Sequence, residues 1–207
     1  MQKTKIVFAS SNAGKIREIN YLINKNLDGL EIELLGLKDV GFTDEIIEDG
    51  ETFEENAEIK ARAVFDKTGM ICFGDDSGLC VDYLNGAPGV YSARYSGGDS
   101  NDNIKKLLEE LINVPDDKRT AHFYCSFCCI VSQSESFFVS GKCEGIITRE
   151  KYGESGFGYD PVFIPVLPGN PPENKTFAQM TEEEKNKVSH RALALEQFAK
   201  KIVKYIL

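Results

Sequence analysis

The pattern of apolar and polar positions predicts a chain that alternates between buried strands and amphipathic helices. Residues 5–9 form a short apolar run typical of a buried strand, and apolar residues then recur at helical spacing up to about residue 24. Alternation and short apolar runs predict strands near residues 32–35, 71 and 79, a hairpin over 120–132 and 135–139, and a strand over 143–148. Helical spacing predicts helices over 53–66, over 104–112 and in two segments after residue 181. Two stretches are expected as loops: 85–99, rich in Gly, Ser and Tyr, and 165–175, which holds four prolines.

Strands in hairpins with flanking helices indicate an α/β fold with a mixed sheet. No repeat, low-complexity tract or linker divides the chain, so one domain over residues 1–207 is expected. With 42% apolar and 28% charged residues, the composition is typical of soluble globular proteins. The first apolar run is too short for a signal peptide and no run reaches transmembrane length. We therefore expect a cytoplasmic protein that does not bind membranes.

Charge and cysteine content exclude two further classes. The net charge of −9 argues against nucleic-acid binding. Cys125 and Cys128 have the spacing of a Cys-x-x-Cys pair, but they fall in a run that alternates as a strand. The alternation places Cys125 on one face and Cys128 on the other, so we interpret the thiols as small buried apolar groups and reject a zinc site.

The first candidate site is an acidic pair, Asp75-Asp76, bounded by Gly74 and Gly78. The apolar runs on either side predict two strands joined here by a tight turn, which the glycines would permit. An exposed turn would simply solvate both carboxylates. The alternative is a site for a divalent cation and an attacking water.

The second candidate site is the loop Ser10–Lys15, which connects the first predicted strand to the first helix. Backbone N–H groups at a helix N-terminus attract anions, and Lys15 would add a charge. The loop is not a P-loop, because glycines are missing and Ile16 stands where a hydroxyl should follow the lysine. An ordinary helix start fits the loop equally well.

Two further segments carry polar groups of interest. Thr52 and Glu55 form a capping-box pattern, which explains the nearby acids but not Glu48, which precedes the helix. Phe157 lies between two glycines and could either stack on a flat ligand or fill the core. Downstream, His190 and Arg191 open the last helix, with Ser189 as its expected cap; because cations are unfavourable at a helix start, they indicate an anionic or acceptor-rich ligand.

Taken together, these segments resemble the inosine triphosphate pyrophosphatase family. The resemblance is carried, in the family's order and over nearly the whole chain, by Ser10-Ser11-Asn12-Ala13-Gly14-Lys15, Thr52-Phe53-Glu54-Glu55-Asn56-Ala57, Asp75-Asp76-Ser77-Gly78, Gly86-Ala87-Pro88-Gly89-Val90-Tyr91-Ser92-Ala93-Arg94-Tyr95, Phe157-Gly158-Tyr159-Asp160-Pro161 and Ser189-His190-Arg191. Ser11 stands where many members have glycine, which bears on how closely its N–H can approach a phosphate.

The resemblance implies a fold, an activity and residue roles. It implies an elongated mixed sheet flanked by helices, two lobes with a central nucleotide-binding cleft, and a homodimer. It implies Mg²⁺-assisted hydrolysis of non-standard purine nucleoside triphosphates (ITP, dITP and XTP) to the monophosphate and pyrophosphate, which clears them from the nucleotide pool. Asp76 would be the proton acceptor and, with Glu48, a Mg²⁺ ligand; Glu55 and Asp75 are further candidates. The substrate would be held by Ser10, Ser11, Asn12, Ala13, Gly14, Lys15 and Ser77 at the triphosphate and by Phe157, Gly158, Tyr159, Asp160, Lys185, His190 and Arg191 at the base and the rest of the nucleotide.

Three alternatives remain open. A nucleotide-binding regulator would use the same loop but needs no general base, which the Asp75-Asp76 pair argues against. A phosphotransferase would transfer the γ-phosphate, but no P-loop or kinase signature supports it. A pyrophosphatase for pyrimidine or modified nucleotides is the nearest enzymatic alternative.

Overall fold

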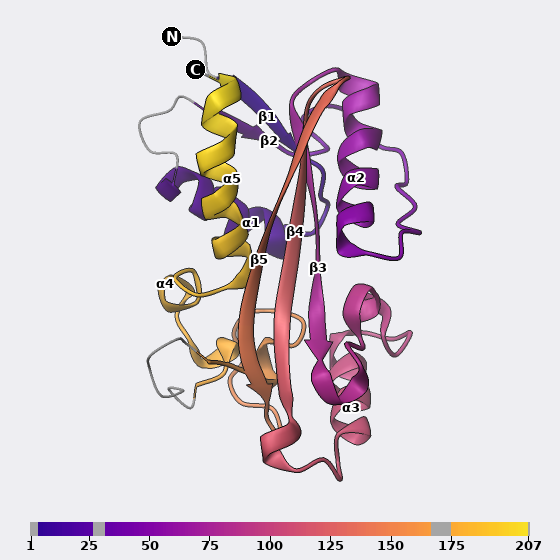
Figure 1. Ribbon diagram of the computed structural model, residues 1–207, viewed down its shortest axis with the longest axis vertical. Helices are drawn as coiled ribbons and strands as arrows, with labels where there is room; N and C mark the ends of the chain where they lie inside the picture. Colours follow the sequence, from indigo (N-terminus) through magenta and orange to yellow (C-terminus); the bar gives the residue numbers. More distant parts are fainter. Residues whose placement is uncertain (1–3, 27–31, 167–174, 207) are drawn as a thin grey trace. The chain divides into compact units, whose positions relative to one another are not determined.

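The computed structural model describes residues 4–26, 32–166 and 175–206. Its strands form one six-stranded mixed sheet in the order β2-β1-β3-β4-β5-β6. β1 pairs in parallel with both β2 and β3, whereas β6 pairs antiparallel with β5 (Figure 1). The strands are β1 (Thr4–Phe8), β2 (Ile32–Leu35), β3 (Cys72–Val81), β4 (Thr120–Ser132), β5 (Glu135–Ile147) and β6 (Phe163–Pro165). The α-helices are α1 (Ala13–Asn26), α2 (Phe53–Thr68), α3 (Ser100–Glu110), α4 (Glu182–Lys185) and α5 (His190–Ile206). The predicted mixed α/β fold is confirmed.

The chain divides into two compact units, each built from separate stretches of sequence. The first unit comprises Met1–Asp76, Cys125–Gly141 and Arg191–Leu207, and the second comprises Ser77–Tyr124 and Lys142–His190. The boundaries fall within β3, β4 and β5, so each of these strands contributes to both units. Two units agree with the expected two lobes, while the nucleotide-binding cleft stays a prediction.

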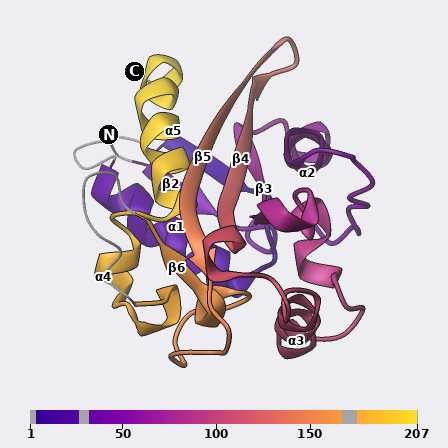
Figure 2. The ribbon, with the colours of Figure 1, turned by 60° about the horizontal axis from the view of Figure 1, so that its bottom comes forward.

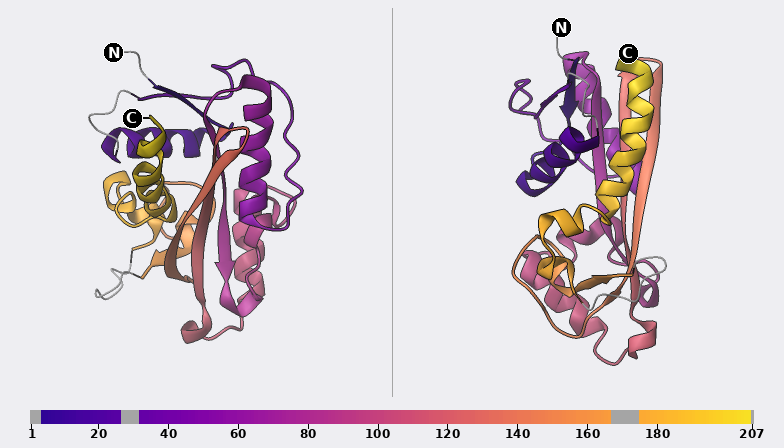
Figure 3. Two further views of the ribbon diagram at one scale, coloured as in Figure 1. Left: turned by 45° about the horizontal axis from the view of Figure 1, so that its top comes forward. Right: turned by 90° about the vertical axis from the view of Figure 1, so that its left-hand side faces the viewer.

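The first unit has helices on both faces of its strands. α1 and α5 lie on one face and α2 on the other (Figures 1 and 3). Aromatic packing anchors the α5 face, where the Phe73 ring lies 4.8 Å from that of Phe8 and 4.7 Å from that of Phe198. Each face of the sheet therefore has its own apolar cluster.

The cysteines of β4 lie in these clusters as the strand pattern predicted. Cys125 and Cys129 pack on the α1 and α5 side, whereas Cys128 packs on the α2 side, and all three are fully buried. Burial raises the pKa of the Cys128 thiol to about 12, which keeps it protonated and unreactive at neutral pH. The interpretation of these thiols as buried apolar groups is confirmed.

Helix α2 begins and ends with well-formed caps. Thr52 Oγ1 accepts from Glu55 N at 3.1 Å, and the Glu55 carboxylate accepts from Thr52 N at 3.0 Å, which is the predicted capping box. Gly69 ends the helix with φ +65° and donates its N–H to Phe65 O. The carboxylate of Glu55 thus serves the helix start.

The acidic pair does not lie in a turn. β3 runs without a break from Cys72 to Val81, so the prediction of two strands joined by a glycine turn was wrong. Gly74 is outside the left-handed region, and a Cβ built on it would lie 2.4 Å from Ala57 O. The glycine is needed because α2 approaches the strand closely, and the chain does not turn there.

We therefore expect Gly74→Ala to destabilise the protein. The added methyl group would meet backbone atoms of α2 that cannot rotate away, and overpacking of this kind costs about 1–3 kcal/mol. Urea unfolding of the variant measures the loss. Gly36→Ala is the matched control, because its Cβ would find only the Asp39 side chain, at 3.5 Å. Equal free energies of unfolding for the two variants would contradict this explanation of Gly74.

The structure also corrects two other elements. β5 is continuous, so the separate strands expected over 135–139 and 143–148 are one strand, paired along the sheet with β4. β6 was missed because its three residues are too short to show a period. The expected proline-rich loop over 165–175 lies mostly outside the described residues.

The second unit has a core of its own. α3 packs its apolar face, with Ile104, Leu107 and nearby Leu111, against a cluster that includes Leu79 and Phe163. Figure 2 shows β6 beside the C-terminal part of β5. The segment expected as a loop over 85–99 contains a 3₁₀ helix, η2 (Gly89–Arg94), and is pinned by Asn103, whose Oδ1 accepts from Ser96 N at 2.7 Å.

Within residues 4–26, 32–166 and 175–206, no helix is both long and apolar enough to cross a membrane.

Candidate active site

The acidic pair lies inside the first unit, on the strand that faces α2. Asp75 is 1% exposed and Asp76 is 8% exposed, so neither carboxylate is solvated as an exposed turn would allow. Buried carboxylates require cationic or hydrogen-bonding partners. The partners of the two residues differ, and they come from different helices.

Asp75 is paired with the predicted anion loop. The Lys15 ammonium at the start of α1 lies 2.8 Å from Asp75 Oδ2. Burial would raise the pKa of Asp75, but the charges of Lys15 and Lys60 lower it below its ordinary value. Asp75 is therefore an ionised anchor that holds Lys15 in place.

The loop before α1 is organised by its own side chains. Asn12 Oδ1 accepts from Gly14 N at 2.9 Å and from Lys15 N at 3.1 Å, and Ser10 Oγ accepts from Asn12 N at 3.2 Å. Asn12 thus acts as the N-cap that the first turn of α1 needs. Ser11 and Ala13 are exposed. An anion at this loop would compete with the Asn12 side chain for the N–H groups of Gly14 and Lys15.

Asp76 shares a lysine with Glu48. The Lys60 ammonium, on α2, lies 2.5 Å from Glu48 Oε2 and 3.6 Å from Asp76 Oδ1. Burial alone would lower the pKa of Lys60, but Asp75, Asp76 and Glu48 raise it above its ordinary value. The sequence predicted that Glu48 and Asp76 act together, and the fold places both against one ammonium group.

Asn56 connects the acidic loop to the strand. Its amide accepts from Gly50 N at 2.9 Å and donates to Gly50 O at 3.3 Å and to Asp76 Oδ2 at 3.2 Å. Asn56 is 1% exposed, so these bonds form away from water. The loop that carries Glu48 is thereby held at a fixed place beside Asp76.

The pKa of Asp76 is raised above its ordinary range. Burial is the main cause, and the charges of Asp75 and Glu48 add to it, while Lys60 and Lys15 oppose it. A carboxylate with a raised pKa is a stronger base than an exposed one. The two adjacent carboxyl groups therefore differ, because the pKa of Asp75 is lowered and the pKa of Asp76 is raised.

The donor set fits a hard divalent cation. Among the described residues no group of three or more His, Cys, Asp or Glu side chains forms a metal cage. Mg²⁺ rarely uses such cages, and is bound by one or two carboxylates together with water and substrate phosphates. Glu48 and Asp76 supply that number of carboxylates, and their oxygens already converge on one positive charge, the ammonium of Lys60.

Arg191 has a buried partner that the sequence did not reveal. Its Nε lies 3.4 Å from Glu18 Oε2, and both side chains are less than 10% exposed. The argument that Arg191 at the start of α5 requires an anionic ligand was therefore incomplete, because Glu18 of α1 supplies a negative charge. Arg191 is held in the first unit by this ion pair.

The second unit carries the remaining predicted residues, beginning with a tight turn at Phe157. Asp160 N donates to Phe157 O at 3.3 Å, and Gly158 in between has φ +59°, a conformation that favours glycine. Asp160 Oδ2 accepts from Phe157 N at 2.8 Å and from Lys185 Nζ at 2.7 Å. Phe157 is 36% exposed, so its ring does not fill the core.

Lys185 and His190 pack against aromatic rings of the same unit. The Lys185 ammonium lies 5.0 Å from the centroid of the Phe157 ring. The His190 ring stacks on Phe123, with centroids 4.8 Å apart and planes 9° apart, and it is 2% exposed. Tyr159 is also buried and donates its hydroxyl to Ser92 O at 3.0 Å. Phe157 and Gly158 are therefore the more accessible members of the predicted base-binding set.

The predicted residues thus form two groups, each described within its own unit. Ser10 to Lys15, Glu48, Asp75, Asp76 and Arg191 belong to the first unit, and Ser77, Phe157 to Asp160, Lys185 and His190 belong to the second. Sequence reasoning missed the roles of Lys60, Asn56 and Glu18. Lys60 could have been noticed, because it falls on the same helical face as the apolar residues Ala57, Ala61 and Val64, where a lysine needs a partner.

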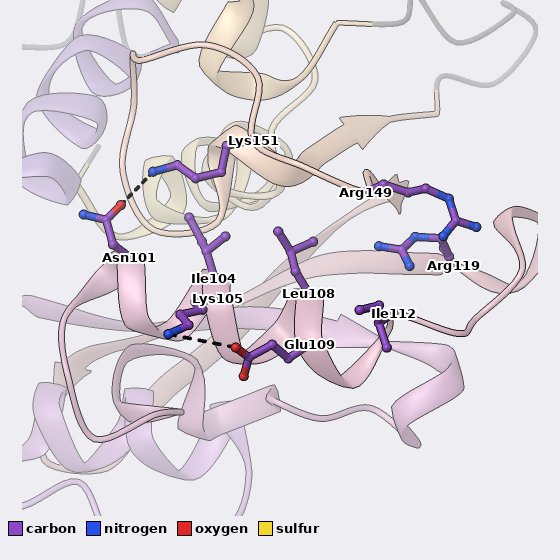
Figure 4. Close-up of a pocket in the computed structure, with 9 residues that line it drawn as sticks. All are labelled: Asn101, Ile104, Lys105, Leu108, Glu109, Ile112, Arg119, Arg149 and Lys151. Atoms are coloured by element: carbon purple, nitrogen blue, oxygen red, sulfur yellow. Dashed lines mark hydrogen bonds and ion pairs between the residues drawn. The ribbon is translucent and has the colours of Figure 1, made fainter.

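A separate pocket of about 520 Å³ lies in the second unit beside α3 (Figure 4). Its lining residues are Asn101, Ile104, Lys105, Leu108, Glu109, Ile112, Arg119, Arg149 and Lys151. The Arg119 guanidinium donates to three backbone carbonyls, and Arg149 pairs with Asp116 at 2.7 Å. These cations have structural partners, and the pocket shares no residue with the candidate site.

Comparison with known proteins identifies the family. The model of the Ham1 family matches residues 6–201. The chain belongs to the Ham1 family. A curated relative, the dITP/XTP pyrophosphatase of Bacillus licheniformis, is 45% identical over 94% of this chain and 96% of its own length. This confirms the family resemblance that the motifs predicted.

Solved Ham1 structures share the fold. The HAM1 protein of Coxiella burnetii matches with a TM-score of 0.84 at 38% identity, covering 97% of this chain and 99% of that one. The Ham1 protein of Staphylococcus aureus matches with a TM-score of 0.82 at 36% identity, covering the same shares of the two chains. The mixed sheet with flanking helices is therefore the Ham1 fold.

Proposed function

We propose that this Ham1-family chain hydrolyses non-standard purine nucleoside triphosphates, dITP, ITP and XTP, to the monophosphate and pyrophosphate. The observation that carries the proposal is the partly buried cluster in which Asp75, Asp76 and Glu48 meet Lys15 and Lys60. An acidic pair in this setting supports a hydrolase, and the relatives named dITP/XTP pyrophosphatase support the substrate class.

Asp76 is proposed as the proton acceptor. Water attacks the α-phosphorus, the bond from that phosphorus to the bridging oxygen breaks, and pyrophosphate leaves. The proton of the attacking water passes to Asp76, whose orientation Asn56 fixes. Asp75 contributes by holding Lys15 at the start of α1, where the ammonium and the helix N-terminus favour phosphate oxygens. Ser77, next to Asp76, is proposed to contact the same phosphates.

Glu48 and Asp76 are the residues proposed to hold Mg²⁺. When bound, a divalent cation supplies Lewis-acid stabilisation of the phosphoryl oxygens and offsets the negative charge of the triphosphate. The offset matters here because the chain itself carries a net charge of −9.

The base is proposed to contact the turn at Phe157. The exposed ring can stack on a purine, and Gly158 allows close approach of the backbone. Tyr159, Asp160, Lys185, His190 and Arg191 complete the proposed set. Asp160 and Lys185 shape the turn through their ion pair, and the buried His190 stacks on Phe123 in the same unit.

Product analysis tests the proposed reaction. With dITP and MgCl₂, anion exchange should resolve dIMP and pyrophosphate as the first products. In ¹⁸O-water the label should enter dIMP only, because the attack is on the α-phosphorus. A diphosphate and orthophosphate as first products would contradict this. Transfer of the γ-phosphate to an acceptor molecule would indicate a phosphotransferase. Binding of dITP without turnover would indicate a regulator.

A homodimer stays a prediction from the family resemblance, and a cytoplasmic location stays a prediction from the sequence pattern. Faster turnover of pyrimidine than of purine substrates would point to the neighbouring class of pyrophosphatases.

A further inference from the structure

Lys60 is a buried lysine in the middle of a helix, and its position calls for an explanation. The residue is 7% exposed, and a buried ammonium is costly unless it is paired. Its Nζ lies 2.5 Å from Glu48 Oε2 and 3.6 Å from Asp76 Oδ1. The ammonium thus occupies the place where the oxygens of the two proposed metal ligands converge.

The Asp76 carboxylate and the backbone close to Glu48 are positioned by contacts that do not involve Lys60. Asn56 donates to Asp76 Oδ2 and exchanges two hydrogen bonds with Gly50, two residues after Glu48. The second oxygen of Asp76, Oδ1, is the one nearer Lys60. The Asp76 carboxylate and the loop that carries Glu48 therefore have supports other than Lys60, whereas the Glu48 carboxylate itself contacts the Lys60 ammonium.

The local charges require one cation at this place. Lys15 lies against Asp75 at 2.8 Å, so Lys60 is the ammonium that pairs with Glu48 and Asp76 and offsets one of their two negative charges. Without it, two carboxylates of like charge would stand close together in a partly buried site. A divalent cation and the ammonium would compete for the same oxygens and would repel each other.

We propose that Lys60 is an internal counter-cation of the Glu48–Asp76 pair, and that a divalent cation binds there by displacing its ammonium. The proposal rests on the metal assignment made for the proposed function. Lysine suits the role because its charge is compact and its four-carbon stem is flexible, so the ammonium can withdraw without a change in α2. Lys60 keeps the carboxylates together in the metal-free protein and lowers their affinity for the metal.

Lys60→Met tests the proposal, because it keeps the apolar stem and removes the charge. In EDTA the melting temperature of the variant should fall below that of the wild type, since the two carboxylates lose their counter-ion. Mn²⁺, a probe for oxygen-ligand sites that electron paramagnetic resonance can follow, should bind the nucleotide-free variant about tenfold or more tightly than the wild type. Saturating MgCl₂ should also raise the melting temperature of the variant more.

Two matched variants serve as controls. Lys67→Met removes another lysine of the same helix. The carboxylate partner of Lys67, Asp44, lies 2.7 Å away and is exposed, so the melting temperature and the Mn²⁺ affinity should change little. Lys60→Arg keeps the positive charge and should bind Mn²⁺ no more tightly than the wild type.

Equal or weaker Mn²⁺ binding by Lys60→Met would overturn the proposal. Should this variant fail to fold in EDTA, MgCl₂ is expected to restore its fold, and failure to refold would also count against the proposal. No nucleotide or turnover enters these measurements. A chain that does not hydrolyse dITP, yet binds Mn²⁺ more tightly as Lys60→Met, would contradict the proposed function alone.

Discussion

Replacing Asp76 by asparagine should lower kcat for dITP by on the order of 10²–10⁴-fold, the range typical of losing a general base. Asparagine has the size of aspartate and keeps an oxygen that can accept from Asn56, so the hydrogen bond to Asp76 Oδ2 has a substitute. What it cannot do is take up the proton of the attacking water. Steady-state kinetics with dITP at saturating MgCl₂, beside a thermal unfolding curve, measures both effects.

Asp49→Asn is the control for this substitution. Asp49 follows Glu48 in the same acidic loop but is exposed, so its removal makes the same change in net charge without touching the cluster. Turnover of this variant should stay close to that of the wild type. An Asp76→Asn enzyme that keeps more than about a tenth of the wild-type rate would remove Asp76 from the mechanism.

The sequence predicted those elements whose pattern was local. β2 and β4 have the predicted bounds, and α2 begins at its predicted capping box. These predictions were correct because alternation, helical spacing and cap residues are signals that involve only residues close together in the sequence. β6 was missed because it depends on its pairing with β5, which no local pattern encodes.

Gly74 shows why local rules fail at the site itself. Glycine beside two aspartates is typical of a turn, and the sequence offers no sign that α2 will pack against this strand. The close approach of Ala57 O to Gly74 is a tertiary contact, and the glycine with its two aspartates lies in a buried strand that packs against α2. The acidic pair was thus recognised, but its surroundings were predicted incorrectly.

The partners of the acidic residues were hidden for the same reason. Asn56 and Lys60 are four residues apart on α2, where they look like ordinary polar positions, and only the packing of the helix aims both at Asp76. Glu18 and Arg191 are far apart in sequence and meet only when α1 and α5 pack on the same face. Family motifs predicted which residues matter, whereas the fold supplies what each one contacts.

Selection of the base should give the largest effect. We expect kcat/KM for ITP and XTP to exceed that for ATP by about 10⁴-fold, the discrimination reached when a site built to pair a polar group meets one that it cannot pair. ITP and XTP carry a keto oxygen at C6, which accepts hydrogen bonds, whereas ATP carries an amino donor. The proposed site is rich in donors, because Lys185 and Arg191 have no acceptor atoms and His190 can donate from a ring N–H group.

The turn at Phe157 gives this preference a structural basis. In a turn closed by Asp160 N and Phe157 O, the closing hydrogen bond uses neither N–H group of the two central residues, Gly158 and Tyr159. We propose that these two N–H groups contact the C6 substituent of a purine stacked on the Phe157 ring. A keto oxygen would accept from them, and an amino group would set donor against donor once the bound base has displaced water from these N–H groups. GTP shares the keto oxygen, so only its 2-amino group can count against it, and a smaller factor is expected.

Selection at C6 is tested by measuring kcat/KM under one condition for four substrates and one analogue. These are ITP, XTP, GTP, ATP and purine riboside triphosphate. The analogue has hydrogen at C6, so it lacks the acceptor without adding a donor, and its kcat/KM should lie between those of ITP and ATP. An analogue as poor as ATP would mean that the missing acceptor, rather than a clash of donors, sets the preference. Equal kcat/KM for ITP and ATP would end the assignment to non-standard purines, because a site that cannot tell keto from amino at C6 would consume the ordinary nucleotide pool.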